Sequence, residues 1–242
     1  MNDGGGGFPA TRHSVIGRLR ENDPDGRRDA FGELVDAYWK PVYKHLRLTW
    51  RLAPEDAQDL TQGFFAEAFE KEWLERFEPG KARFRTFVRV CADRFVMNSR
   101  QSAARQKRGG GARMIALDFE TVERDMLKAG HDAAPDPDAF FHQEFVRALF
   151  ERAVASVRRE YDEAGRSAQF TLFERYDLAP EDGVSYGSLA QEFGLTTTQV
   201  TNHLAQVRRR FREHALEALR ALCGNDEEFE REARDLFGKE RG

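Results

Sequence analysis

The chain has 242 residues, of which 33% are charged and 40% hydrophobic, and its formal net charge is −4. Its apolar runs are too short to span a bilayer, and its N-terminus lacks the basic start and apolar core of a secretory signal. Two cysteines cannot build a disulfide framework or a cysteine-based zinc site. We therefore expect a cytoplasmic protein without a membrane segment, metal or cofactor.

Apolar residues repeat at helical spacing from the first part of the chain onward. The first such stripe holds Phe31, Leu34, Val35, Tyr38 and Trp39. A second helix is predicted to start at Pro54, because proline suits the first turn and the acidic residues after it suit the positive end of the dipole. Its apolar face holds Ala57, Leu60, Phe64, Phe65, Ala68 and Phe69. Beyond the Pro79-Gly80 break, a third helix carries Phe84, Phe87, Val88, Cys91, Phe95 and Val96.

The second half of the chain is also predicted to be helical. A glycine run at 109–111 ends the first set, and an acidic, proline-containing stretch with at most one weak helix follows. Further helices are expected from residue 140, around residue 170, and at 185–193, 197–222 and 226–237. The fold class is all-α, with two helical domains joined by a flexible linker. The predicted boundaries are a partly disordered segment 1–26, domain 27–108, linker 109–137, domain 138–223 and acidic tail 224–242.

Charge alternates in blocks that the net value hides. Residues 55–78 carry a net −6, residues 81–108 a net +8 and residues 200–220 a net +3, while linker and tail are acidic. A basic block attracts polyanions, and an acidic block suits a basic protein partner. The basic block at 84–108 also interleaves aromatic residues, a composition suited to a separated DNA strand. The loop 77–84 before it is expected to offer a pocket to an unstacked base.

Residues 186–196 have the pattern of the first helix and turn of a helix-turn-helix. Ala190 allows close helix crossing, Gly194 suits the tight turn, and Thr196 or Thr197 can cap the next helix. The outward side chains of that helix are of the type that reads base edges in a major groove: Thr198, Gln199, Thr201, Asn202, His203 and Gln206. The arginines that follow suit phosphates: Arg208, Arg209, Arg210 and Arg212.

Over about residues 29–222 the chain resembles a sigma-70-family RNA polymerase sigma factor of the extracytoplasmic-function (ECF) type. Residues 56–65 (DAQDLTQGFF) resemble region 2.2, which docks on the polymerase clamp helices, and residues 84–94 (FRTFVRVCADR) resemble the start of the region that melts and reads the minus-ten element. Residues 105–111 (RQKRGGG) resemble the sequence with which this first domain ends in one ECF subgroup. The helix-turn-helix resembles region 4.2, which binds the minus-thirty-five element, and region 3 is absent, as in ECF members.

The resemblance implies a transcription initiation factor that binds core RNA polymerase, through its clamp helices and flap, and directs it to promoter DNA. The implied polymerase contacts are Asp56, Gln58, Asp59, Leu60, Gln62 and Phe64. The implied minus-ten contacts are Lys81, Arg83, Phe84, Arg85, Arg89, Arg94, Asn98, Arg105, Lys107 and Arg108. The implied minus-thirty-five contacts are Thr197, Thr198, Gln199, Thr201, Asn202, His203, Gln206, Arg208 and Arg209.

The chain departs from the family pattern at several of these positions. Phe87 stands where many members have tryptophan, Arg94 where they have asparagine, and His203 and Gln206 where arginine is frequent. Promoter sequence therefore does not transfer. Many ECF factors are held by anti-sigma proteins, and some subgroups are linked to serine/threonine kinases. Thr61 is a candidate phosphorylation site, where a phosphate would add a charge of about −1.5 to −2.

Three other functions are alternatives to this one. A stand-alone helix-turn-helix regulator would bind duplex DNA without polymerase, usually as a symmetric dimer, but would leave the first domain without a role. An adaptor would bind polymerase or a sigma factor without DNA. An enzyme is disfavoured because the sequence has no phosphate loop, no His-Glu-x-x-His motif and no Gly-x-Ser-x-Gly elbow.

Overall fold

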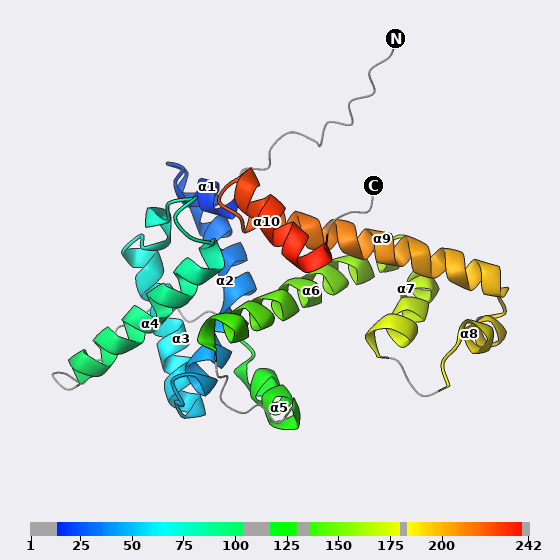
Figure 1. Ribbon diagram of the computed structural model, residues 1–242, viewed down its shortest axis with the longest axis horizontal. Helices are drawn as coiled ribbons and strands as arrows, with labels where there is room; N and C mark the ends of the chain where they lie inside the picture. The colour runs from blue at the N-terminus through cyan, green and yellow to red at the C-terminus, as the bar shows by residue number, and fades with distance from the viewer. Residues whose placement is uncertain (1–13, 104–116, 130–135, 180–182, 239–242) are drawn as a thin grey trace, which may run out of the picture. The chain divides into compact units, whose positions relative to one another are not determined.

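The computed structural model describes residues 14–103, 117–129, 136–179 and 183–238 (Figure 1). Within these ranges 81% of the residues are helical and no strand occurs, which confirms the all-α class. The chain divides into two compact units: unit 1 comprises Met1–Ala148 and Arg220–Gly242, and unit 2 comprises Leu149–Leu219. In the described part of the chain, no helix combines the length and the apolar character that crossing a membrane requires.

Unit 1 begins with α1 (Val15–Leu19), which the sequence analysis did not predict. Ser14 caps this helix by accepting a hydrogen bond from the Gly17 N–H. Val15, Ile16 and Leu19 are buried. Part of the segment 1–26, predicted to be partly disordered, therefore belongs to the core; residues 1–13 lie outside the described ranges.

Three further helices of unit 1 match the apolar stripes. They are α2 (Pro24–Leu48), α3 (Pro54–Glu70) and, after a short 3₁₀ turn at Leu74–Arg76, α4 (Phe84–Ala103). The predicted helix start at Pro54 is confirmed, with Glu55 and Asp56 in the first turn. The order of these helices along unit 1 can be followed in Figure 1.

Aromatic residues make up much of the core of unit 1. The rings of Phe64 and Phe65 lie 4.9 Å apart, and Phe64 also meets Phe95 at 6.0 Å. The ring of Phe84 lies 5.0 Å from Phe77 and 5.7 Å from Tyr38, both in edge-to-face contact. Such pairs add about 0.5–1.5 kcal/mol beyond the area that they bury. Much of the phenylalanine excess is thus used in packing.

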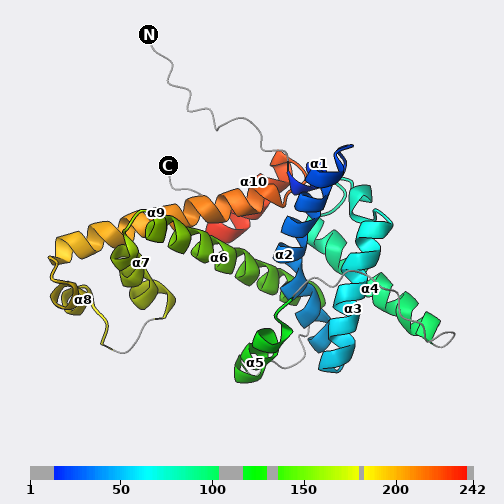
Figure 2. The same ribbon diagram turned by 180° about the vertical axis from the view of Figure 1, so that it is seen from behind.

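The one weak helix allowed for within the predicted linker 109–137 is present as α5 (Phe119–Ala129), but it is docked on α2, so this part of the segment is not a flexible linker. The Phe119 ring packs 5.4 Å from Trp39 and 4.9 Å from Tyr43 of α2. Glu123 accepts hydrogen bonds from Tyr43 Oη at 2.5 Å and from Arg47 Nη2 at 3.1 Å. Figure 2 shows α5 beside the end of α2. Its apolar residues Phe119, Val122 and Met126 share one buried face, which holds the segment against unit 1.

The acidic tail is also part of unit 1. Residues Asp226–Phe237 form α10, capped by Asn225, whose side chain accepts from the Glu228 N–H. Glu228 and Glu232 are each only 2% exposed. The predicted boundary at 223/224 therefore does not separate a free tail from a folded domain.

Unit 2 consists of the second half of α6 (Pro137–Glu163), α7 (Ser167–Phe173), a π turn (Glu174–Leu178), α8 (Tyr186–Phe193) and most of α9 (Thr197–Ala221). Its core brings Val157 and Phe170 together with Leu189 and with Val200 and Leu204 of α9. The helices predicted after residue 137 are all present, although α6 and α9 each contribute residues to both units. The bounds of unit 2 are therefore narrower than the predicted domain 138–223.

Candidate functional site

Two helices and a tight turn form the core of the candidate site in unit 2. Ser185 and Ser188 cap α8 reciprocally, each side chain accepting from the other residue's backbone N–H. Gly194 ends α8 with φ of 65°, a left-handed conformation that glycine adopts at little cost. The Leu195 N–H then donates to the Ala190 carbonyl at 2.8 Å, which closes the turn. The predicted roles of Gly194 and of Ala190 at 7% exposure agree with this geometry.

The first turn of α9 is capped by Thr196 and Gln199. The Gln199 N–H donates to Thr196 Oγ1 at 3.2 Å, and Gln199 Oε1 accepts from the Thr196 N–H at 2.8 Å. This pattern is a capping box. Because the amide oxygen of Gln199 is engaged at the helix start, the residue lacks the free amide that bidentate pairing with adenine requires. The candidate base contact at Gln199 is therefore better explained as a cap.

The remaining outward residues of α9 line one side of the helix. Val200, Leu204 and Val207 are fully buried, as predicted for the inner face. The opposite face of α9 is exposed, and residues spaced three or four apart share it: Thr198, Asn202, Gln206 and Arg209. Thr197 and Thr201 are also exposed, and His203 is half-buried. The Thr201 hydroxyl donates to the Thr197 carbonyl at 2.9 Å, so part of its hydrogen-bonding capacity is used within the helix.

Arg208 differs from Arg209 in its surroundings. Its Nε and Nη2 donate to the two oxygens of Asp177 at 2.9 and 2.8 Å, and its guanidinium lies over the Tyr176 ring. The hydrogen bonds to Asp177 raise the pKa of Arg208 above its usual range. Arg209 is 70% exposed, and its one ion pair among the described residues is with Glu213, at 3.8 Å. The Arg208 guanidinium, which was expected to contact a phosphate, is thus bound to a carboxylate, whereas the Arg209 guanidinium is exposed and can reach a phosphate.

Arg210 and His214 of α9 hold Glu160 of α6. Arg210 donates to both Glu160 oxygens, at 2.8 and 2.9 Å, and His214 Nε2 lies 2.7 Å from Glu160 Oε2. The hydrogen bond from Arg210 is the main reason why the pKa of Glu160 falls to about 2. Arg210 is therefore an anchor within unit 2 rather than a free phosphate contact.

Glu160→Gln is expected to remove a pH-dependent part of the stability of unit 2. Because the pKa of Glu160 is lower in the folded than in the unfolded chain, its stabilising effect is complete above 4.5 and is lost as the pH falls through about 2. At pH 6 the variant should melt about 2–4 °C lower, roughly 1 kcal/mol for a chain of this size. At pH 2 most of this difference should have disappeared. Thermal unfolding followed by circular dichroism measures both, and an equal difference at the two pH values would contradict the role of Glu160.

In unit 1, the candidate polymerase contacts on α3 divide into exposed and buried residues. Asp56 and Asp59 are exposed, and Gln58, Leu60 and Gln62 are half-buried. Phe64 is 0% exposed and packs against Phe65 and Phe95, so its assignment as a polymerase contact is wrong. A partner could reach the carboxylates but not the Phe64 ring.

Thr61 is unsuited to phosphorylation in this fold. Its side chain is 0% exposed, and Oγ1 donates to the Ala57 carbonyl at 2.7 Å. A kinase would have to unwind α3 to reach the hydroxyl, and a phosphate there would place a double charge in the core. The burial of Thr61 could have been predicted from the sequence, because Thr61 follows Ala57 by four residues and so lies on the same face of the helix.

The start of α4 holds the candidate minus-ten residues, several of which are engaged within unit 1. Phe84 is 1% exposed, so its assignment as a base contact is wrong. Arg83 donates to Asp235 at 2.7 Å, and Arg85 donates to Glu232 at 3.0 Å. Arg89 meets Asp93 and Asp138, each at 2.6 Å. Within the described ranges, these cations already have carboxylate partners.

Other candidate minus-ten residues are more accessible. Lys81 is exposed and, within the part of the chain that the structure describes, forms an ion pair with the exposed Glu78 alone. Arg94 and Asn98 are exposed further along α4. The last three candidates, Arg105, Lys107 and Arg108, lie outside the described residues.

Sequence reasoning missed the carboxylates that meet the start of α4. Glu228, Glu232 and Asp235 follow one another at spacings of four and three residues along α10, so they share one helix face. That spacing was readable from the sequence, although the contact partners, more than 140 residues away, were not.

Comparison with known proteins adds no family assignment: no family model, no curated protein and no solved structure matches this chain.

Proposed function

We propose that this chain is a transcription initiation factor that joins core RNA polymerase and directs it to promoter DNA. The observation that carries the proposal is the capped turn at Gly194 followed by the exposed polar face of α9, with Asn202, Gln206 and Arg209. A helix entering a major groove presents short polar side chains to base edges and an arginine to the backbone. We assign α9 to the minus-thirty-five element.

The charges of unit 1 support the polymerase part of the proposal. Asp56 and Asp59 are exposed on the first two turns of α3. The basic block that follows carries two exposed cations, Lys81 and Arg94. A stand-alone DNA-binding regulator has no use for an exposed acidic helix face, because such a face repels DNA. In the proposed function the acidic face meets the polymerase clamp, and the basic block meets the melted minus-ten strand. The flap of the polymerase is the proposed partner of unit 2.

The experiment that tests this proposal is a gel shift of duplex promoter fragments with and without core polymerase. We expect sequence-specific complexes only when the chain and the core enzyme are both present. Equal binding by the chain alone would instead indicate a stand-alone regulator. Polymerase binding without any DNA affinity in the complex would indicate an adaptor.

The contrast between Arg208 and Arg209 yields a prediction for the chain–polymerase complex. Arg209→Ala should weaken promoter binding at all sequences and reduce the salt slope by about one, the effect of losing one phosphate contact. Arg208→Ala should leave the salt slope unchanged and instead cost up to about 1 kcal/mol of unfolding free energy, because it removes the ion pair with Asp177. Asp177→Ala is the matched control and should behave like Arg208→Ala. A lower salt slope for Arg208→Ala alone would contradict this division of roles.

A further inference from the structure

Carboxylates from the C-terminal part of the chain cover the start of α4. The Phe84 N–H, one of the unpaired donors at a helix N-terminus, donates to Glu228 Oε1, and Glu228 Oε2 accepts from the Gly224 N–H at 3.0 Å. Glu232 lies 3.0 Å from Arg85 Nε and 3.4 Å from Arg83 Nε. The Phe84 N–H, the dipole of α4 and two arginines together are groups of the kind that bind phosphate. Here they bind carboxylates of α10.

The segment before α10 covers the loop that precedes α4. A Cβ added at Gly224 would lie 2.7 Å from Cε1 of Phe77 and 3.0 Å from Cγ of Pro79. The first distance is shorter than real Cβ atoms show and the second is tighter than most, and the Phe77 ring is buried, which leaves it little room to move. Gly224 therefore permits the C-terminal segment to lie directly on the loop 77–84, where the sequence predicts a pocket for an unstacked base.

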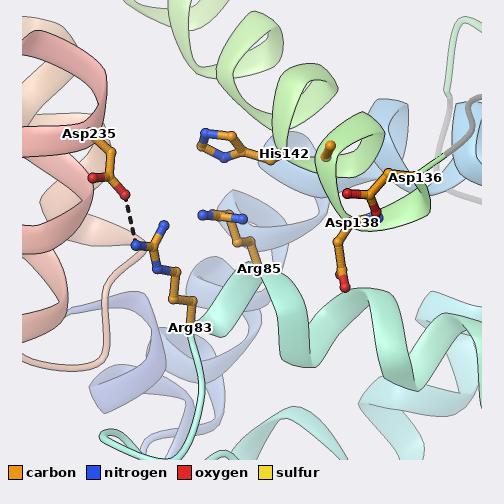
Figure 3. A pocket seen from close by; sticks show the side chains of 7 residues that line it. Arg83, Arg85, Asp136, Asp138, His142 and Asp235 are labelled. Atoms are coloured by element: carbon orange, nitrogen blue, oxygen red, sulfur yellow. Dashed lines mark hydrogen bonds and ion pairs between the residues drawn. The ribbon is translucent and has the colours of Figure 1, made fainter.

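The outer part of this contact is open to water. Arg83, Arg85 and Asp235 border a hollow of about 460 Å³, whose other side is formed by the start of α6, including His142 (Figure 3). The side chain of Arg83 is 30% exposed and that of Asp235 is 46% exposed. An ion pair exposed to this degree contributes little free energy, so a competing polyanion can replace the Arg83–Asp235 pair first, ahead of the more buried Arg85–Glu232 pair.

We propose that α10 is an intramolecular mimic of nucleic-acid backbone, whose carboxylates Glu228, Glu232 and Asp235 cover the phosphate-binding start of α4 until a DNA strand displaces them. The proposal rests on the proposed function, because it takes this surface as the place of the promoter strand. In the isolated chain the surface is closed. Displacement exposes Arg83, Arg85 and the first N–H groups of α4 to phosphates.

Two variants open this contact by different physical routes. Glu232→Gln/Asp235→Asn weakens the attraction to Arg83 and Arg85 with little change of shape, and Gly224→Ala forces the segment off the Phe77 ring without changing charge. The control, Glu227→Gln/Glu230→Gln, removes the same two charges from exposed positions of α10. Full-length proteins are compared for binding of a fluorescent single-stranded DNA of mixed sequence, after circular dichroism has verified that they fold.

We expect each opened variant to bind the single strand about tenfold more tightly than the wild-type chain, the gain expected when a closed state that predominates about ten to one is removed. The control should change affinity less than about twofold, as expected for remote charges that salt screens. An equal gain in the control, or no gain in the charge variant, would overturn the proposal. If Gly224→Ala does not fold, the charge variant and its control decide alone.

A transcription assay with core polymerase separates this proposal from the proposed function. Promoter-directed transcription by the wild-type chain, with no gain of DNA affinity in the opened variants, would overturn the mimic alone. A gain of DNA affinity in the opened variants, with no stimulation of polymerase by any protein, would support the mimic and overturn the proposed function.

Discussion

Asp56→Arg/Asp59→Arg is expected to abolish binding to core RNA polymerase. The two carboxylates are exposed on successive turns of α3, and in the proposed function they face a basic clamp. Like charges placed across an interface cost several kcal/mol, so the affinity should fall by at least about 100-fold. Fluorescence anisotropy of the labelled chain titrated with core polymerase measures the change.

Two controls make this result specific. Asp29→Arg/Asp36→Arg reverses the same charge at exposed positions of α2 and should alter the affinity little. Reversal of Asp56, in the first turn of α3, also weakens the helix by about 0.3–1 kcal/mol through the dipole, and thermal melting will show whether unit 1 remains folded. Equal losses in both double variants would show that net charge, rather than the α3 surface, controls binding.

Glu144→Ala should be among the most destabilising single substitutions in unit 1. Lys44 Nζ of α2 lies 2.5 Å from Glu144 Oε2 of α6, and the two side chains are 8% and 2% exposed. Removal of the carboxylate leaves a buried ammonium group without its partner, which costs about 3–5 kcal/mol of unfolding free energy. Urea unfolding followed by tryptophan fluorescence reports on this unit, because Trp39, Trp50 and Trp73 all belong to it.

A double variant separates the pair's charge from its packing. Lys44→Met/Glu144→Leu removes both charges and fills similar volume, and we expect it to be at least as stable as the wild type. A double variant that is as unstable as Glu144→Ala would indicate that the polar contact itself, rather than the isolated charge, determines stability.

The elements of this fold that could be predicted are those encoded locally. The apolar stripe from Phe31 to Trp39, the start signal at Pro54 and the turn glycine at Gly194 each specify a helix or its end within a few residues. The burial of Phe64 and Phe84 is also readable from the sequence, because both lie in predicted apolar stripes, and Thr61 shares the face of Ala57 four residues before it. The family resemblance, and not the apolar pattern, implies partner contacts for Phe64 and Phe84.

Tertiary partners could not be predicted in the same way. Arg85 and Glu232 are 147 residues apart, and nothing near either residue in sequence indicates that they meet. Arg208 and Arg209 are neighbours with the same charge, but only the packing of α9 directs Arg208 to Asp177 and leaves Arg209 exposed. The docking of α5 depends likewise on the distant Trp39 and Tyr43. Charge blocks predict which segments carry cations, and the fold determines which of those cations remain accessible.

The most direct test of the proposed function is transcription from a library of duplex promoter fragments by core polymerase reconstituted with the full chain, followed by mapping of transcript start sites. We predict start sites that depend on the chain and share sequence elements upstream, centred near the minus-ten and minus-thirty-five positions. The same set of start sites with and without the chain would contradict the assignment of this protein as an initiation factor.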